Sequence, residues 1–310
     1  MAGITDRPFR DLVDRFGAGL VVSEMVASAE MVAAKPSVRA RAELGLGAAR
    51  TAIQIAGREA HLMAEAARIA EAQGAAIIDI NMGCPAKKVT NGYSGSALMR
   101  DPDHALRLIE AVVGAVKVPV TLKTRLGWDE AQRNAPAIAA RAAAAGVQMI
   151  TIHGRTRCQF YSGHADWAAI RSVTDAVRIP VVANGDITDA GSARRALALS
   201  GAAGVMVGRG AQGQPWILAQ IAAALYGTPQ PVPPKGAALA ELVATHYTAM
   251  LGFYGRDLGL RVARKHLGWY MDRAGTPAAP RRRILTAQND QDVLAQLPDV
   301  FAHPPERVAA

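Results

Sequence analysis

Cysteine and long apolar runs are both scarce in this chain of 310 residues. It contains only Cys84 and Cys158, too few for a disulfide framework, which fits a reducing compartment such as the cytoplasm. A single bridge between these two residues stays open. No apolar run reaches the roughly 18 residues of a membrane span. The first residues show no basic region followed by an apolar one, so we expect no secretory signal.

Acidic residues are outnumbered, with 26 Asp and Glu against 35 Lys and Arg, and the net charge is +9. The excess is concentrated in residues 256–283, which contain eight Lys or Arg and two Asp. A clustered positive charge favours a polyanion such as nucleic acid as partner, although a solvated helix face is the commoner origin of such a run.

Strand and helix patterns alternate along the first two thirds of the chain. Seven runs have apolar bodies and polar or glycine ends, at residues 20–25, 52–55, 77–81, 118–125, 149–154, 179–186 and 205–209. Ala-rich segments of helical period lie between them, for example at residues 59–73, 103–116, 135–145 and 190–199. The alternation predicts parallel βαβ units in an α/β fold, a (β/α)₈ TIM barrel.

One strand of this barrel is expected to be missing from the chain. The first helical pattern, at residues 7–16, precedes the first visible strand. Because each helix of such a barrel follows a strand, an eighth strand would lie upstream of Met1, and we expect the natural product to carry it.

A proline-rich segment divides the chain. Residues 226–236 contain four prolines and predict a stiff linker. We therefore expect a catalytic barrel domain over residues 1–225. A small helical domain is expected over residues 237–310, where apolar residues recur at helical spacing.

Ligand-binding side chains of a parallel barrel lie at the carboxyl ends of its strands. Here those positions carry Glu24, Met25, Gln54, Asn81, Cys84, Lys123, Arg125, His153, Asn184, Gly185, Asp186, Gly208 and Arg209. Glycines after the last two strands let backbone amides approach a phosphate, so the sequence predicts a phosphorylated cofactor. Residues 208–213 match G-x-G-x-x-G, but the strands precede this pattern rather than follow it, which argues against a Rossmann fold.

Cys84 is the candidate for the chemistry. It lies in a Gly83-Cys84-Pro85 loop directly after the strand at residues 77–81, and such a loop presents a thiol rather than packing it. A buried structural cysteine is the alternative.

The chain resembles the tRNA-dihydrouridine synthases, most closely their DusB or NifR3-like branch. The resemblance runs nearly end to end and rests on residues 1–10, 22–25, 54–57, 79–88, 123, 151–157, 183–187, 208–209 and 264–270. It implies an FMN-binding barrel that reduces the C5=C6 bond of selected uridines in tRNA to dihydrouridine, with NADPH as reductant. The branch points to position 17 of the tRNA.

The resemblance also implies residue roles. The reduced flavin gives hydride to C6 of the uracil, and Cys84 protonates C5. The residues expected to bind FMN are Met1, Ala2, Gln54, Lys123, His153, Asn184, Gly185, Asp186, Gly208 and Arg209. Among these, Lys123 would stabilise the N1 and O2 edge of the reduced ring, and a core histidine is the alternative for His153. Asn81 and Arg157 are candidates for uracil contacts, and no metal is expected.

The helical domain is expected to bind tRNA. Arg261, Arg264 and Lys265 share one face of a predicted helix and could contact phosphates. Two alternatives stay open: a flavin barrel acting on a free pyrimidine, such as a dihydropyrimidine or dihydroorotate dehydrogenase, and a non-catalytic RNA-binding regulator. The oligomeric state is open, with a monomer as the expectation, and the location is expected to be cytoplasmic.

Overall fold

The computed structural model describes residues 1, 3–35, 42–45 and 51–302. By their contacts these form two compact units, one of Met1–Asp6 with Gly19–Gly208 and one of Arg7–Ala18 with residues from Arg209 onward. The predicted functional boundaries at residues 225 and 237 stay a prediction, because the packing assigns α1 (Arg7–Arg15) and residues after Gly208 to the second unit.

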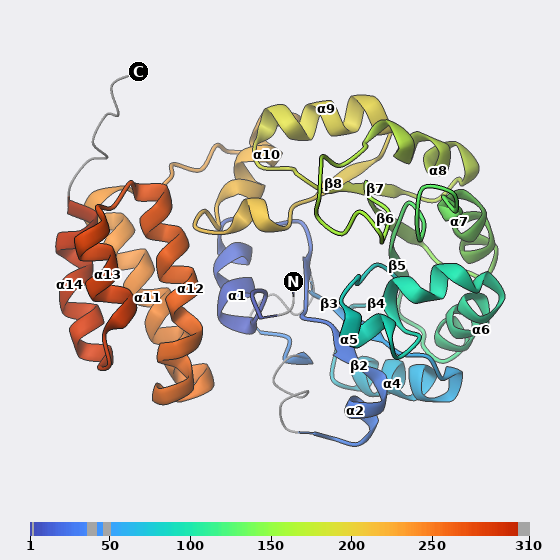
Figure 1. The fold of residues 1–310 in the computed structure, drawn as a ribbon, viewed down its shortest axis with the longest axis horizontal. Helices are drawn as coiled ribbons and strands as arrows, with labels where there is room; N and C mark the ends of the chain where they lie inside the picture. The colour runs from blue at the N-terminus through green and yellow to red at the C-terminus, as the bar shows by residue number, and fades with distance from the viewer. Residues whose placement is uncertain (2, 36–41, 46–50, 303–310) are drawn as a thin grey trace. The chain divides into compact units, whose positions relative to one another are not determined.

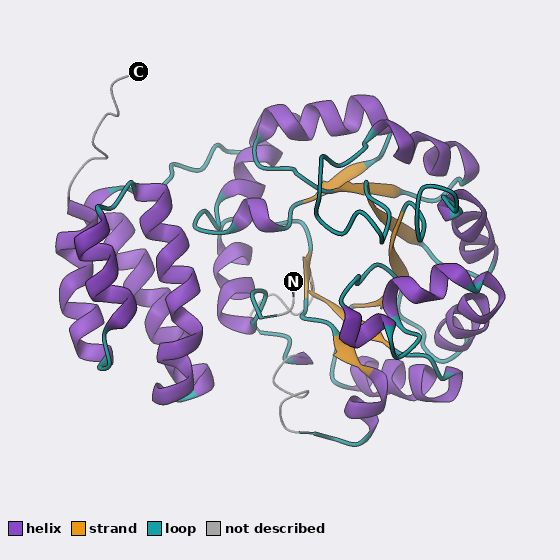
Figure 2. Ribbon diagram, viewed as in Figure 1, coloured by secondary structure: helices purple, strands orange, loops and turns teal. Residues whose placement is uncertain are grey.

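The first unit is built on one parallel sheet. Its strands are β1 (Val21–Val22), β2 (Val26–Ala27), β3 (Thr51–Ala56), β4 (Ile77–Asn81), β5 (Val120–Arg125), β6 (Met149–His153), β7 (Val181–Asn184) and β8 (Gly204–Met206). They pair in parallel in the order β1-β3-β4-β5-β6-β7-β8, and β2 also pairs with β3. The predicted α/β fold is confirmed, and the strands form an inner layer with helices outside (Figures 1 and 2).

Helices connect consecutive strands of this sheet. They are α2 (Ser28–Val32), α4 (Ala60–Ala72), α5 (Lys87–Thr90), η2 (Gly95–Arg100), α6 (Pro102–Val113), α7 (Ala135–Ala144), η3 (Ala168–Ile170), α8 (Arg171–Ala176) and α9 (Ala190–Ser200). Local signals fix their starts: Asp101 caps α6 ahead of a proline, and Asp189 forms a capping box with Ser192 at α9. Small alanine side chains, such as Ala66 and Ala67 at 0% exposure, let α4 pack closely.

The strand bodies form the core of this unit. Ile55, Ile78 and Ile152 are completely buried, as expected for a parallel sheet covered on both faces. The strand predicted at residues 20–25 is wrong in one respect, because it is split into β1 and β2. The backbone amide of Ser23 still donates to the carbonyl of Ala52 at 2.9 Å, and the hydroxyl of Ser23 accepts from the backbone amide of Gln54 at 3.0 Å.

The path of strands is open. Among the described residues no strand joins β8 to β1, and β8 is only half-buried. The predicted eighth strand therefore stays a prediction.

The second unit consists of helices. They are α1, η4 (Arg209–Ala211), α10 (Ile217–Tyr226), α11 (Gly236–Tyr254), α12 (Arg256–Ala274), α13 (Ala278–Thr286) and α14 (Asp290–Ala302). Figure 1 shows α11 to α14 side by side, around a core that includes Tyr247, Met271 and Phe301. At Gly259 a Cβ would lie 2.9 Å from Leu251 Cα, so glycine permits the close approach of α12 to α11. In the described part of the chain every helix is too short or too polar to cross a lipid bilayer.

Candidate active site

Strand register brings the predicted site residues to one end of the sheet. Asn81 of β4 pairs with Lys123 of β5, and His153 of β6 pairs with Asn184 of β7. Because all the strands are parallel, these four residues share the carboxyl end, where barrel ligands bind. The sequence predicted this grouping.

A buried network of side chains links β3, β4 and β5. The side chain of Gln54 donates from Nε2 to Asp79 Oδ2 at 2.6 Å, and its Oε1 accepts from Asn81 Nδ2 at 2.8 Å. Thr121 donates to Asp79 Oδ1 at 2.6 Å. Burial raises the pKa of Asp79, while the hydrogen bonds from Thr121 and Gln54 oppose that shift. Asp79 thus acts as a structural anchor that fixes the orientation of Gln54.

The loop of Cys84 is held from both sides through its backbone. Asn81 Oδ1 accepts from the amides of Gly83 at 3.1 Å and Cys84 at 2.9 Å. The carbonyl of Cys84 accepts from the amide and the hydroxyl of Ser96 at 3.1 and 2.9 Å. The thiol itself is half-buried and free of disulfide bonding. The loop therefore positions a thiol at the carboxyl end of β4, and the Cys84–Cys158 bridge is not formed.

Lys123 places a cation in the same site. Its pKa is lowered to about 8, mainly by burial and next by the positive charge of Arg125, whereas Asp79 and Cys84 act in the opposite direction. Within the described residues its ammonium group makes no hydrogen bond or ion pair. A half-buried ammonium that forms no direct ion pair in the described part of the chain is suited to a polar or anionic ligand.

Arg125 ties two loops of the site together. Its Nε donates to the carbonyl of Gly83 at 2.8 Å, and its Nη1 donates to the carbonyls of Thr156 and Phe160, each at 2.9 Å. The guanidinium also lies 5.6 Å from the ring centre of Tyr161. Burial lowers the pKa of Arg125 to about 10, so it stays charged near neutral pH.

Arg155 was not predicted as a site residue, yet it organises the ends of β6 and β7. It forms a two-pronged ion pair with Asp186, at 3.1 and 2.6 Å, and lies 3.2 Å from His153 Nε2. A guanidinium only donates, so Nε2 of His153 accepts and its ring proton lies on Nδ1. The carboxylate of Asp186 also accepts from the backbone amide of Ala165 at 2.8 Å, so this side chain orients Arg155 and the segment at Ala165. The Arg in the His153-Gly154-Arg155 string was the available sequence signal.

Breaking this ion pair should destabilise the protein. Arg155 is 2% exposed, and Arg155→Met removes the guanidinium that pairs with the partly buried carboxylate of Asp186. We expect a loss of about 3 kcal/mol in the free energy of unfolding, measured by urea titration. Arg141→Met is the control, because Arg141 pairs with Asp103 on the surface and should lose less than about 1 kcal/mol. Equal losses in the two variants would contradict the prediction.

The predicted phosphate end lies after β7 and β8. Asn184 donates to the carbonyl of Met206 at 2.8 Å. Gly185 has φ 113°, and a Cβ there would lie 2.7 Å from Ala165 Cβ, so only glycine fits. A Cβ at Gly208 would lie 3.6 Å from the sulfur of Met1, which puts Met1 at this end of the sheet. Arg209, which comes directly after Gly208 in the chain, is exposed. Ala2 lies outside the described residues.

Arg157 packs beside an aromatic ring. Its guanidinium lies 4.7 Å from the ring centre of Trp128, and the guanidinium of Arg100 lies 5.0 Å from the same ring. The buried Nε of Arg157 has no hydrogen-bond partner. Trp128, after β5, was not predicted, and it fixes the position of the predicted Arg157.

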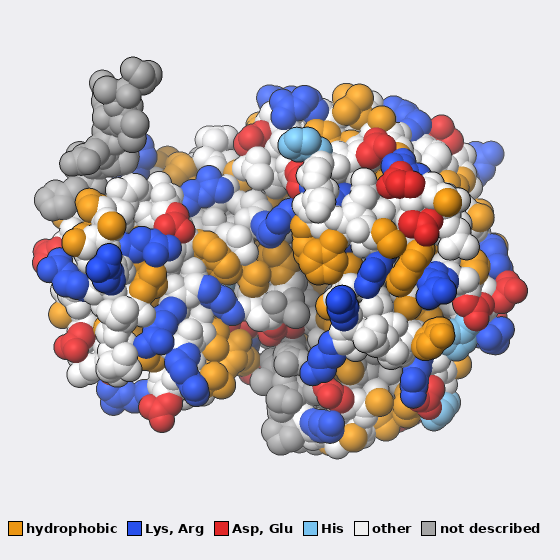
Figure 3. Space-filling model, viewed as in Figure 1, with side chains coloured by type: hydrophobic (Ala, Val, Ile, Leu, Met, Phe, Trp, Pro, Cys, Tyr) orange, Lys and Arg blue, Asp and Glu red, His pale blue; other side chains and the backbone are white. Residues whose placement is uncertain are grey.

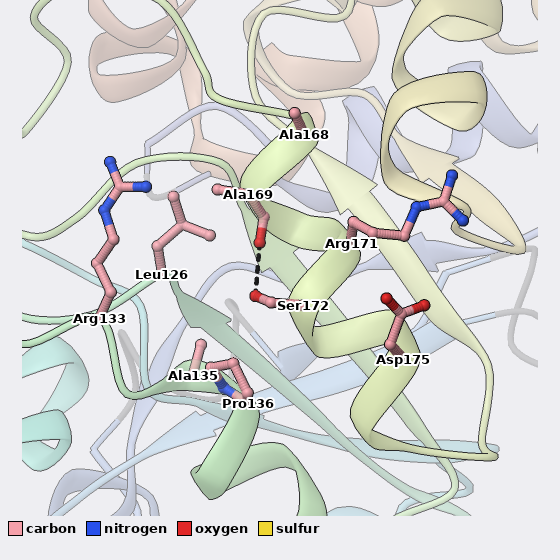
Figure 4. A pocket seen from close by; sticks show the side chains of 9 residues that line it. All are labelled: Leu126, Arg133, Ala135, Pro136, Ala168, Ala169, Arg171, Ser172 and Asp175. Carbon is pink, nitrogen blue, oxygen red and sulfur yellow. Dashed lines mark hydrogen bonds between the residues drawn. The ribbon is translucent and has the colours of Figure 1, made fainter.

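A separate cavity of about 360 Å³ lies between the start of α7 and the η3–α8 segment (Figure 4). None of the predicted site residues lines it. Its arginines are engaged elsewhere, since Arg133 pairs with Glu130 and Asp166 and Arg171 donates to the carbonyl of Ala198. The described residues include no cluster of three or more His, Cys, Asp or Glu that could hold a metal ion.

The predicted tRNA-binding residues all lie on α12 but differ in their surroundings. Arg261 is exposed, and its Nε donates to the carbonyl of Asp257 at 3.3 Å. Arg264 is half-buried and donates to the carbonyl of Ala287 at 3.2 Å. Lys265 is half-buried. The aromatic side of this helix is core, because His266 and Tyr270 are 1% exposed.

Sequence comparison gives the family. A model of the family described as dihydrouridine synthase (Dus) matches residues 1–303. The chain belongs to the dihydrouridine synthase family. It is 67% identical to a probable tRNA-dihydrouridine synthase of Rhodobacter capsulatus, over 100% of this chain and 94% of that protein. It is 46% identical to tRNA-dihydrouridine synthase B of Xanthomonas axonopodis pv. citri, over 97% of this chain and 91% of that protein.

Comparison with solved structures supports the same barrel fold. A histamine dehydrogenase from Rhizobium sp. 4-9 superimposes with a TM-score of 0.54 at 13% identity. The match covers 80% of this chain and 47% of that longer one. At this identity the likeness concerns the barrel fold alone.

Proposed function

We propose that this chain is a tRNA-dihydrouridine synthase that uses FMN and NADPH to reduce a uridine of tRNA, with position 17 as the expected site. The observation that carries the proposal is the placement of Cys84 and Lys123 at one end of the sheet in a chain of this family. The relatives named tRNA-dihydrouridine synthase support the reaction.

The residues present fit a flavin. Lys123 offers a half-buried cation that forms no direct ion pair among the described residues, which suits the N1 and O2 edge of the ring. Gln54 and His153 would contact the ring system, and Asn184, Gly185 and Gly208 would hold the phosphate end. The roles of Met1, Ala2, Asp186 and Arg209 in cofactor binding stay predictions.

Each side chain then has a defined task in the reaction. When bound and reduced, FMN supplies the hydride that C6 of the uracil requires. Cys84 holds the proton that C5 receives, and Asn81 keeps this thiol in place by binding the loop amides. Direct contacts of Asn81 and Arg157 with the uracil stay predictions. The side-chain oxygen of Asn81 is already engaged by the amides of the Cys84 loop.

Mapping dihydrouridine by mass spectrometry tests the proposal. Deleting the gene from its host should remove dihydrouridine at one tRNA position, and the wild-type gene should restore it. Purified protein should also show the absorption spectrum of a flavin. An unchanged map in a host without a second synthase for that position, together with turnover of free uracil, would assign the chain to free pyrimidines instead.

Basic residues of α12 should govern the salt dependence of tRNA binding. The binding constant for tRNA falls as salt rises, so the slope of log K against log salt is negative. Replacing Arg261, Arg264 and Lys265 by Ala should make this slope less negative by about 2, because each lost phosphate contact removes less than one released counterion. Arg264 contributes least, since it is held by the carbonyl of Ala287. The measurement is a filter-binding titration at several salt concentrations, with Arg68→Ala on α4 as control. An unaltered slope would locate the RNA surface elsewhere.

A further inference from the structure

Two exposed aromatic side chains of the barrel unit have an unfavourable backbone conformation. Tyr93 is 68% exposed with φ 54°, and Phe160 is 44% exposed with φ 55°. A left-handed conformation costs free energy in a bulky residue. The Tyr93 ring recovers little of it by burial, and the Phe160 ring packs edge-on against Tyr161, with ring centres 4.8 Å apart. Two such residues beside the candidate active site indicate a function that stability does not explain.

The turn that carries Phe160 is fastened to the loop of Cys84. The amide of Phe160 donates to the carbonyl of Arg157 at 3.0 Å, which closes the turn. Its carbonyl accepts from Arg125, and the same guanidinium holds the carbonyl of Gly83, the residue before Cys84. One buried side chain therefore fixes the position of Phe160 relative to the candidate proton donor.

The segment that carries Tyr93 is fastened to the same loop. Its amide donates to the carbonyl of Thr90 at 3.0 Å, and Ser96, three residues later, holds the carbonyl of Cys84. A Cβ at Gly95 would lie 2.8 Å from that carbonyl, so this segment packs directly on the backbone of Cys84. Phe160 is thus linked to the Cys84 loop through the side chain of Arg125, and Tyr93 through the segment that ends at Ser96.

Cations lie on the segments that carry or adjoin these residues. Lys87 and Lys88 of α5 are exposed near Tyr93 in the chain, and Arg100 and Arg157 flank Trp128. Figure 3 shows Lys and Arg side chains among hydrophobic ones on the visible face of this unit. Exposed rings for base stacking beside cations for phosphates are the pattern of a surface for unpaired RNA.

We propose that Tyr93 and Phe160 are stacking platforms for the nucleotides that flank the target uridine. This inference rests on the proposed function and deepens it. A uridine that enters the site must leave its stack, and its two neighbours each lose a stacking face. Two aromatic residues linked to the Cys84 loop would replace those faces and keep the extruded uridine at the thiol.

Substitution of each ring tests the proposal. Tyr93→Ala and Phe160→Ala should each raise the dissociation constant for tRNA about tenfold, with unchanged flavin content. Phe160→Trp should retain wild-type binding. Leu199→Ala is the control, since Leu199 is 49% exposed near the end of α9, which runs away from the carboxyl ends of the strands. A dissociation constant that stays within twofold of wild type in both alanine variants would overturn the inference.

A glycine variant separates binding from folding. Phe160→Gly removes the ring and relieves the backbone at φ 55°, so it should raise the melting temperature while it weakens tRNA binding. A more stable protein with wild-type affinity would refute the stacking role. If wild type reduces tRNA and these variants bind equally well, only this inference fails; if wild type neither binds nor reduces tRNA, the proposed function fails with it.

Discussion

Cys84→Ala should lower the rate of dihydrouridine formation by a factor of about 100 to 10,000, the usual contribution of a positioned general acid. The reason is chemical rather than structural. The loop is held through the backbone, by Asn81 on the amides and Ser96 on the carbonyl, so alanine removes the thiol and leaves the turn intact. Single-turnover reduction of tRNA by the reduced enzyme measures the effect.

The second cysteine provides the control for that experiment. Cys158 is exposed, and Cys158→Ala should keep the wild-type rate. Cys84→Ser should behave like Cys84→Ala, because a hydroxyl is too weak an acid for the step. Flavin content and the dissociation constant for tRNA should be unchanged in all three variants. A Cys84→Ala enzyme that retains its single-turnover rate would remove Cys84 from the mechanism.

The strand-end positions were predictable because two regularities combine. Buried runs such as residues 77–81 mark the strands, and polar residues directly after them must share one end of a parallel sheet. Asn81 and Lys123 were found in this way, and the register pairs them. The helices were equally visible, since amphipathic spacing and capping residues such as Asp189 are local signals.

Interactions between distant segments were not predictable in the same way. The partner of Asp186 is Arg155, and the choice depends on how two βα loops fold against each other. The basic side chains of α12 illustrate the same limit, because spacing assigns Arg264 to a phosphate-binding face while the fold turns it to the carbonyl of Ala287. Left-handed conformations at Tyr93 and Phe160 also have no sequence signal, since neither is a glycine or an asparagine.

Acid should destabilise the helical unit through two buried histidines. His246 and His266 are 2% and 1% exposed, and their rings lie 5.0 Å apart beside Phe9. Burial lowers the pKa of His246 to about 3 and that of His266 to about 2, with the neighbouring His246 and Lys265 adding to the second shift. Both are neutral when folded and charge on unfolding, so their contribution to stability is complete above pH 6.5 and falls as the pH drops toward the folded values.

Between pH 7 and pH 5 the two histidines together should remove about 4 kcal/mol from the free energy of unfolding. Urea titration followed by circular dichroism measures this difference. His266→Phe, which keeps an aromatic ring against Phe9, should halve it. His61→Gln should leave it unchanged, because His61 is exposed on α4. The variant removes one of the two proton-binding sites. A His266→Phe protein with the full acid sensitivity would therefore mean that groups other than this pair control the pH dependence of the unit's stability.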